Sequence, residues 1–228
     1  MGATEKRFNA IDGVSTYYMR DDNSRKIRPA SFSSTDETYD TLVHFKRDLD
    51  AYTRPAGYGA ITVIASAGAY VNKPGKHGQG NAFDLDQVRW ESGRWCSPIY
   101  GVHNHSKQWA RLRYYALDAV CRQWFGTVLD GNYNAAHRDH IHAARGTRIG
   151  LTRSAKSEMK FIQAICNEFA GQNLKIDGAW GPKTSAAFNI MLAEAGLGRL
   201  KPFTSVRDYR KLLQRISQNG FRGQTFIN

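Results

Sequence analysis

Residues 77–88 read HGQGNAFDLDQV, and residues 134–144 read NAAHRDHIHAA. In the first stretch, apolar and polar residues alternate over positions 81–88, which predicts a β-strand. The second stretch is short, and we expect it to end in another strand. His140 and His142 would then project from the same face of that strand, because they are two positions apart. The two stretches therefore predict strands that carry histidine and carboxylate side chains.

The spacing of these polar residues indicates a metal site. Six residues separate His77 from Asp84, and two of them are the glycines Gly78 and Gly80. Glycine lets the chain turn, so the loop histidine and the strand carboxylate could converge. Two imidazoles and one carboxylate, with a fourth position left to water, form a catalytic zinc site. The alternative is a His-x-His pair that arises by chance on a surface strand, with Asp84 or Asp86 capping a turn.

Helical and strand patterns around these stretches predict an α+β fold. Apolar residues recur along one face over residues 38–52 and 109–125, which predicts two helices. A short β-branched run at residues 60–65 predicts a buried strand. Residues 1–35 are polar, and we expect them to be irregular. The expected architecture is a small antiparallel sheet with flanking helices.

A second, all-α domain is expected at the C-terminal end. Residues 145–157 are basic, contain glycine and lack a sustained apolar period, which indicates a domain boundary. Apolar stripes beyond this segment predict three helices, at residues 159–169, 186–195 and 206–216. We therefore divide the chain into a catalytic domain of residues 1–150 and a three-helix domain of residues 151–228.

The composition is that of a folded protein, with 41% hydrophobic residues and no run of 18 apolar residues that could span a membrane. The net charge of +12 favours an anionic partner, such as nucleic acid, anionic lipid or the bacterial wall. The first 29 residues lack the apolar core of a signal peptide. Cys166 lies in an apolar helical pattern and is expected to be buried, whereas Cys96 and Cys121 could pair in an oxidising compartment.

Two segments resemble a known group of enzymes. HGQGNAFD, residues 77–84, resembles the His-x-x-Gly-x-Ala-x-Asp signature of the zinc D-alanyl-D-alanine peptidases, a group with a hedgehog-like fold that includes murein endopeptidases. Residues 119–144, AVCRQWFGTVLDGNYNAAHRDHIHAA, resemble the C-terminal half of the extensin-like branch of that group. The resemblance implies a zinc peptidase whose metal ligands are His77, Asp84 and His142.

The same resemblance implies roles for the residues before the last ligand. His140 falls at the position beside the metal, where it would hydrogen-bond the attacking water or the developing oxyanion. Many members have a glutamate as general base three residues earlier, where this chain has His137. Histidine suits this role because its unperturbed pKa is about 6.5. Asp139 is the rival, either as the base or as a hydrogen-bond partner within the site.

The substrate-binding group departs from the pattern of the family. Its members carry an arginine upstream of the first ligand that holds the substrate carboxylate or carbonyl. None is evident in SAGAYVNKPGK, residues 66–76, where Lys73 or Lys76 could take its place. Because this arginine serves carboxypeptidase action, its loss favours an endopeptidase.

Residues 174–184, LKIDGAWGPKT, contain Asp-Gly and Gly-Pro pairs that are typical of a tight loop before a helix. The stretch resembles the DGxxGPxT core of the three-helix peptidoglycan-binding domain, and this resemblance covers residues 155–228. We expect most of the motif to shape the loop. Trp180, which we expect at the surface, is the best candidate for a contact with the polymer.

Taken together, the sequence predicts a zinc-dependent peptidoglycan endopeptidase that resembles a phage endolysin. Such a protein stays in the host cytoplasm until lysis and then reaches the cell wall. Peptidoglycan is the expected partner, with no nucleic acid, no stable membrane insertion and a monomeric state. Two alternatives stay open: a metal-dependent nuclease, favoured by the histidines and the positive charge, and a wall-binding protein without catalysis.

Overall fold

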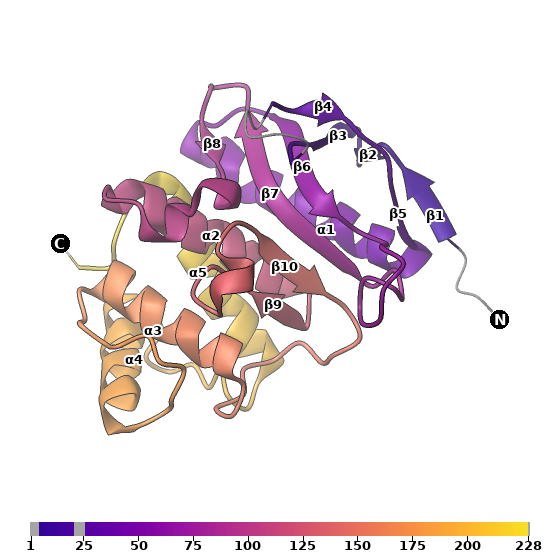
Figure 1. The fold of residues 1–228 in the computed structure, drawn as a ribbon. Coiled ribbons are helices and arrows are strands. Elements are labelled where there is room, and N and C mark those ends of the chain that lie inside the picture. The colour runs from indigo at the N-terminus through magenta and orange to yellow at the C-terminus, as the bar shows by residue number, and fades with distance from the viewer. Residues whose placement is uncertain (1–4, 21–25, 228) are drawn as a thin grey trace.

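The computed structural model describes residues 5–20 and 26–227 and shows an α+β fold, as expected (Figure 1). The α-helices are α1 (Asp36–Thr53), α2 (Gln108–Trp124), α3 (Lys156–Ala170), α4 (Pro182–Glu194) and α5 (Val206–Arg222). The strands are β1 (Glu5–Phe8), β2 (Ala10–Ile11), β3 (Val14–Tyr18), β4 (Arg28–Pro29), β5 (Phe32–Thr35), β6 (Ile61–Gly68), β7 (Ala82–Trp90), β8 (Trp95–Cys96), β9 (Thr127–Leu129) and β10 (Ile141–Ala144). Short 3-10 helices lie at Arg54–Ala56, Pro98–Tyr100, Val102–Asn104 and Ala135–His137.

The main sheet has the strand order β2-β3-β6-β7-β10-β9, with β4 paired to β3 and β8 paired to β7. β3 and β6 run parallel, so the expectation of a small, purely antiparallel sheet is wrong. The expectation of an irregular N-terminal segment is also wrong, since β1 to β5 all lie before residue 36. These strands are short, and β3 buries only alternate residues at its start, Val14 and Thr16, so little apolar sequence marks them.

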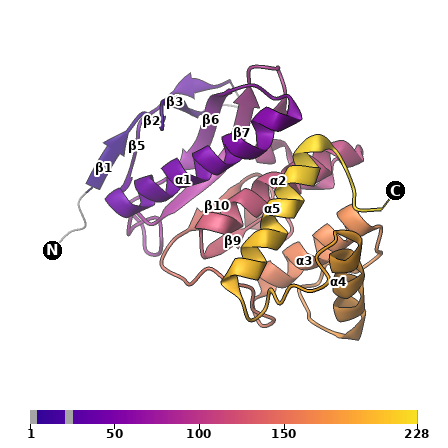
Figure 2. The same ribbon diagram turned by 180° about the vertical axis from the view of Figure 1, so that it is seen from behind.

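Helices cover one face of the main sheet. Figure 1 shows α1 behind the sheet, and Figure 2, seen from behind, shows α1 and α5 in front of it. Phe83 and Leu85 of β7 and Ile141 of β10 are buried in the core that also includes residues of α1 and α2. Because side chains alternate along a strand, Asp84 and His142 project from the opposite face. The core therefore leaves this polar pair on the face without α1.

The C-terminal helices pack directly on the rest of the chain. Ser217 of α5 donates a hydrogen bond to the carbonyl oxygen of Ala116 in α2, at 3.3 Å. A Cβ at Gly220 would press against the Ala116 side chain, so glycine permits this close approach. The three expected helices are present and share one buried core with the sheet. The division into domains of residues 1–150 and 151–228 stays a prediction.

Two further expectations concern the state of the cysteines and the presence of a membrane-spanning helix. Cys96, Cys121 and Cys166 are all buried free thiols. Burial raises the pKa of the Cys96 thiol to about 12. Within residues 5–20 and 26–227, no helix has the length and apolar character that a membrane crossing requires.

Candidate metal centre

Two neighbouring strands position the carboxylate and one imidazole of the predicted site. β7 and β10 are antiparallel, and their register places His142 directly opposite Asp84. Side chains opposite each other in such a pair lie on the same face. His142 Nδ1 is 2.8 Å from Asp84 Oδ1. The hydroxyl of Ser66 donates to the main-chain oxygen of Asp84 at 2.7 Å, which ties β7 to β6 at this point.

The loop between β6 and β7 brings in the third side chain. A Cβ at Gly78 would overlap the carbonyl oxygen of Lys73, and Gly80 has a φ of +66°, so the turn requires glycine at both positions. The loop places Nε2 of His77 at 3.0 Å from Asp84 Oδ2. His77 is only 5% exposed, so its imidazole is held inside the loop.

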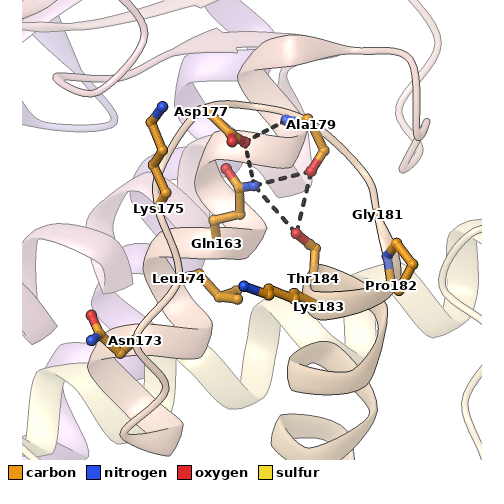
Figure 3. A pocket seen from close by; sticks show the side chains of 10 residues that line it. All are labelled: Gln163, Asn173, Leu174, Lys175, Asp177, Ala179, Gly181, Pro182, Lys183 and Thr184. Atoms are coloured by element: carbon orange, nitrogen blue, oxygen red, sulfur yellow. Dashed lines mark hydrogen bonds between the residues drawn. The ribbon is translucent and has the colours of Figure 1, made fainter.

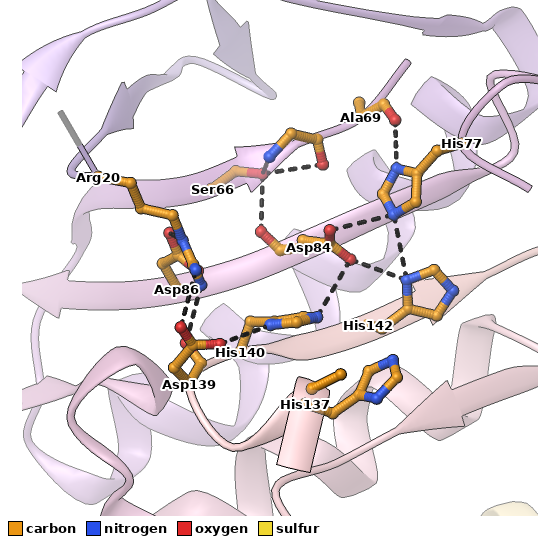
Figure 4. A network of polar contacts seen from close by, with 12 residues as sticks. Arg20, Ser66, Ala69, His77, Asp84, Asp86, His137, Asp139, His140 and His142 are labelled. Carbon is orange, nitrogen blue, oxygen red and sulfur yellow. Dashed lines mark hydrogen bonds and ion pairs between the residues drawn. The ribbon is translucent and has the colours of Figure 1, made fainter. Parts of the chain in front are cut away.

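The donor atoms of His77, Asp84 and His142 converge as the ligands of one ion would (Figure 4). One ligand atom from each residue lies within 4.8 Å of the others, and the two imidazole nitrogens are 3.2 Å apart. Ligands about 2.0–2.1 Å from zinc at tetrahedral angles are themselves separated by roughly 3.3–3.4 Å. The spacing of 2.8–3.2 Å between these side chains is close to that value.

The hydrogen bonds around the cluster leave lone pairs facing inward. A carbonyl oxygen only accepts, so the contact with Ala69 O fixes the hydrogen of His77 on Nδ1. Nε2 of His77 therefore turns its lone pair toward the carboxylate of Asp84. Burial opposes ionisation of Asp84, but the neighbouring imidazoles of His142 and His77 prevail and hold the pKa of this carboxyl well below its usual range. Two imidazole nitrogens and an ionised carboxylate form a donor set that fits a divalent cation.

His137 lies beside this cluster, with its ring centroid 5.8 Å from that of His142. Asn134 caps the 3-10 helix that carries His137, because its Oδ1 accepts from the backbone N–H of Ala136 at 3.0 Å. The same oxygen is 2.7 Å from His137 Nδ1, which must therefore carry the hydrogen. Burial and the nearby charges of His140 and His142 lower the pKa of His137 to about 4. At neutral pH the ring is uncharged, with the lone pair on Nε2 free to accept a proton.

Each ring nitrogen of His140 lies near a carboxylate, that of Asp139 or that of Asp84. Its Nδ1 is 2.9 Å from Asp139 Oδ1, and its Nε2 is 3.7 Å from Asp84 Oδ1. Asp139 Oδ2 in turn accepts from Arg20 Nη1 at 2.8 Å. Arg20 also makes a two-pronged pair with the fully buried Asp86, at 2.8 and 2.6 Å. Both oxygens of Asp139 are thus engaged within the protein.

The three expected substrate-binding residues differ in their exposure. Lys73 is exposed on the β6–β7 loop, and its charge opposes protonation of His77. Lys76 is partly buried, with its ammonium against the backbone of Gly146. Trp180 lies in the loop before α4 and is not freely exposed, because its ring packs edge-on against Phe203 at 4.7 Å between centroids.

A second polar cluster underlies the loop that contains Trp180 (Figure 3). Gln163 of α3 is 2% exposed, and its amide nitrogen lies 2.8 Å from Asp177 Oδ1 and 3.0 Å from the carbonyl oxygen of Ala179. Its amide oxygen accepts from the N–H of Gly178 at 2.8 Å. A pocket of about 630 Å³ adjoins this loop. Asp177 and Gly178 thus shape the loop through bonds to a buried glutamine that the motif does not include.

Three residues that support the site were not expected from the sequence: Arg20, Ser66 and Asn134. Asn134 had a local signal, since an asparagine three residues before His137 is a typical helix cap. Arg20 had none, because its partners are 66 and 119 residues away in the chain.

Comparison with known proteins matches part of the chain to a family. Residues 42–155 match the family model described as the extensin-like protein C-terminus. No curated protein and no solved structure matches the chain. The matched residues cover half of the chain, from α1 to the segment after β10. They include all three side chains of the candidate metal centre together with His137 and His140.

Proposed function

We propose a function from one premise: this chain belongs to the extensin-like protein C-terminus family. We propose that it is a zinc-dependent peptidase that hydrolyses an amide bond in bacterial peptidoglycan. The observation that carries the proposal is the convergence of His77, Asp84 and His142 within 4.8 Å. The resemblance of HGQGNAFD to the signature of zinc D-alanyl-D-alanine peptidases supplies the reaction and the substrate class.

The donor set favours zinc over magnesium or calcium, since imidazole nitrogens suit zinc and the other two ions prefer oxygen ligands. Zinc held by His77, Asp84 and His142 would lower the pKa of a bound water to about 7 and polarise a carbonyl group. With three protein ligands, a bound ion would keep a fourth position for water, which hydrolysis requires. The low pKa of Asp84 keeps this carboxylate ionised and ready to bind a cation.

The remaining side chains then have separate tasks. His137 accepts a proton from the attacking water at Nε2 and returns it to the leaving amine. His140 presents the lone pair of its Nε2 to the attacking water, from which it accepts a hydrogen bond. Asp139 is better suited to orient His140 than to act as the base, because its two oxygens already accept from His140 and Arg20. Lys73 is the exposed cation of the loop and remains the candidate for holding the substrate.

The C-terminal helices would bind the same polymer and raise the local concentration of substrate. The DGxxGPxT pattern at residues 177–184 supports this part of the proposal. Trp180 would contribute the part of its ring that Phe203 and Phe188 leave exposed. We propose that the protein acts as an endolysin-like endopeptidase, which stays in the host cytoplasm until lysis and then reaches the wall.

Digestion of purified sacculi tests the proposal. The zinc-loaded protein should release fragments that mass spectrometry identifies as products of a cut peptide bond. His142→Ala should release them at least about 1000-fold more slowly, because the metal supplies several kcal/mol of transition-state stabilisation. His44→Ala is the matched control, since His44 is exposed on α1 and stacks on Trp124. Equal digestion by the His142→Ala variant and the parent would refute the zinc mechanism, and nicking of a plasmid instead would favour a nuclease.

A further inference from the structure

A chain of ionic hydrogen bonds leads from the N-terminal segment to His140 (Figure 4). Arg20 follows β3, Asp86 lies in β7, and Asp139 immediately precedes His140. Arg20 donates from Nε and Nη2 to the two oxygens of Asp86, at 2.8 and 2.6 Å. It donates from Nη1 to Asp139 Oδ2 at 2.8 Å and from Nη2 to the Asp139 carbonyl oxygen at 3.0 Å. One guanidinium therefore fixes both the side chain and the backbone of the residue before His140.

These contacts leave Arg20 little capacity to bind a substrate. Four of its five N–H groups donate to Asp86 and Asp139. Two carboxylates also outweigh its single positive charge. The side chain of Asp86 is fully buried and needs a cationic partner, which Arg20 provides. Arg20 is thus unsuited to hold the carboxylate of a peptide and well suited to hold Asp139 rigidly.

The position of Asp139 decides how the imidazole of His140 is presented. An ionised carboxylate only accepts hydrogen bonds, so the 2.9 Å contact with Asp139 Oδ1 requires the hydrogen on Nδ1 of His140. Nε2 then carries the lone pair, and it lies on the side of Asp84, 3.7 Å from Oδ1. A histidine that is free to rotate or to change tautomer would not keep this nitrogen in place.

We propose that Arg20 is a positioning residue: it clamps Asp139 to the buried Asp86, and Asp139 in turn orients His140 so that Nε2 faces the candidate metal centre. The role of His140 in turnover rests on the proposed peptidase function. The orientation of its ring does not, because the contacts among Arg20, Asp139 and His140 are present in the protein itself. The sequence motif ends at the histidines, whereas this support comes from a residue 119 positions before Asp139.

The experiment compares Arg20→Gln with Arg47→Gln, a matched control. Arg47 makes a similar two-pronged pair with Asp12, at 3.2 and 3.0 Å, but on the exposed surface of α1. In Arg20→Gln, kcat on sacculi should fall about 10-fold to 100-fold while KM and zinc affinity change less than about twofold. Nitrogen-15 spectra of labelled histidine should show hydrogen on Nδ1 of His140 in the parent and in the control. They should show a mixture of tautomers in Arg20→Gln.

A second variant keeps the test decisive if Arg20→Gln does not fold. The side chain of Asp139 is 40% exposed, so Asp139→Ala should fold, and it should reproduce both the loss in kcat and the mixed tautomers. Because the two residues act as a unit, the double variant should lose no more activity than the stronger single variant. Losses that multiply, or a single variant with the spectra and kcat of Arg47→Gln, would overturn the proposal. A parent protein that cuts no peptidoglycan would refute the proposed function, and the spectra would still decide the inference.

Discussion

The candidate metal centre and the loop at residues 177–179, which is bonded to Gln163, are both built from short motifs. Their polar atoms differ in whether they find hydrogen-bond partners within the protein. In the metal centre, lone pairs of His77 and the carboxylate of Asp84 face one another across 3.0 Å. In the loop, the carboxylate of Asp177 accepts from the N–H of Ala179 at 2.9 Å and from Gln163 at 2.8 Å. The first cluster turns acceptors toward one point, whereas the second pairs its acceptors with donors from the protein.

This difference separates a motif that we propose to bind a metal from one that maintains the shape of a loop. Acceptors that converge without a donor repel each other, so they are stable only when a cation or a proton lies between them. Donors and acceptors that match, as those of Gln163 and Asp177 do, lower the free energy of the fold and need no ligand. The same substitution in the two clusters should therefore affect different properties.

The largest expected effect is on zinc binding by Asp84→Ala. Structural zinc sites bind with about 10–16 kcal/mol shared among four ligands, so one ligand contributes about 3 kcal/mol, or at least about 100-fold in affinity. Competition with a chelating dye measures this loss. Asp177→Ala is the matched control and should bind zinc like the parent. An equal loss in the two variants would show that the metal does not bind at the cluster of His77, Asp84 and His142.

The next largest effect is on stability. Gln163→Ala should lower the free energy of unfolding by about 2–3 kcal/mol, since it creates a cavity and leaves the N–H of Gly178 without its partner, while the carbonyl of Ala179 keeps only the hydroxyl of Thr184. Urea denaturation measures this change. Zinc affinity of the folded variant should match that of the parent. A stable variant with weakened zinc binding would mean that the loop and the metal centre are coupled.

Asn134→Ala should have a smaller effect, on turnover alone. The variant removes the oxygen that holds Nδ1 of His137, at 2.7 Å, and so frees the ring to rotate. We expect kcat to fall about 10-fold, with zinc affinity unchanged. Steady-state digestion of sacculi measures the effect, and Asn173→Ala, an exposed asparagine near the loop, is the control. An unchanged kcat would argue against His137 as the general base.

The elements that the sequence predicted well are those with a local signal. Apolar periodicity placed α2 within one residue of its position, Gln108–Trp124, because a helix that packs on a core needs an apolar stripe. Alternation predicted β7, and the His-x-His spacing predicted that His140 and His142 address one point. Both approach Asp84 Oδ1, at 3.7 and 2.8 Å. The roles of these residues stay predictions, whereas the position of His142 opposite Asp84 follows from strand register.

The features that the sequence did not predict depend on distant partners. Arg20 lies at the end of a short strand in a segment that looked irregular, and only the folded sheet brings it to Asp86 and Asp139. Gln163 is a single polar residue within the apolar stripe of α3. Its structural role follows only from its hydrogen bonds to the loop at residues 177–179. Trp180 was expected at the surface, but Phe203, from another loop, covers part of its ring.

The smallest expected effect is on the pH dependence of the unfolding free energy, through Asp177 in the loop at residues 177–179. Hydrogen bonds from the N–H of Ala179 and from Gln163 lower the pKa of Asp177 below its ordinary value. A carboxyl with a lower pKa in the folded state stabilises the fold above its unfolded pKa of about 3.9, and this contribution is lost as the pH falls through the folded value. Asp177→Asn keeps an acceptor oxygen but does not titrate. The difference in unfolding free energy between parent and Asp177→Asn should therefore be constant from pH 7 to 5 and shrink toward pH 3. Urea denaturation across this range measures it, and a difference that stays constant to pH 3 would show that the loop does not depend on an ionised Asp177.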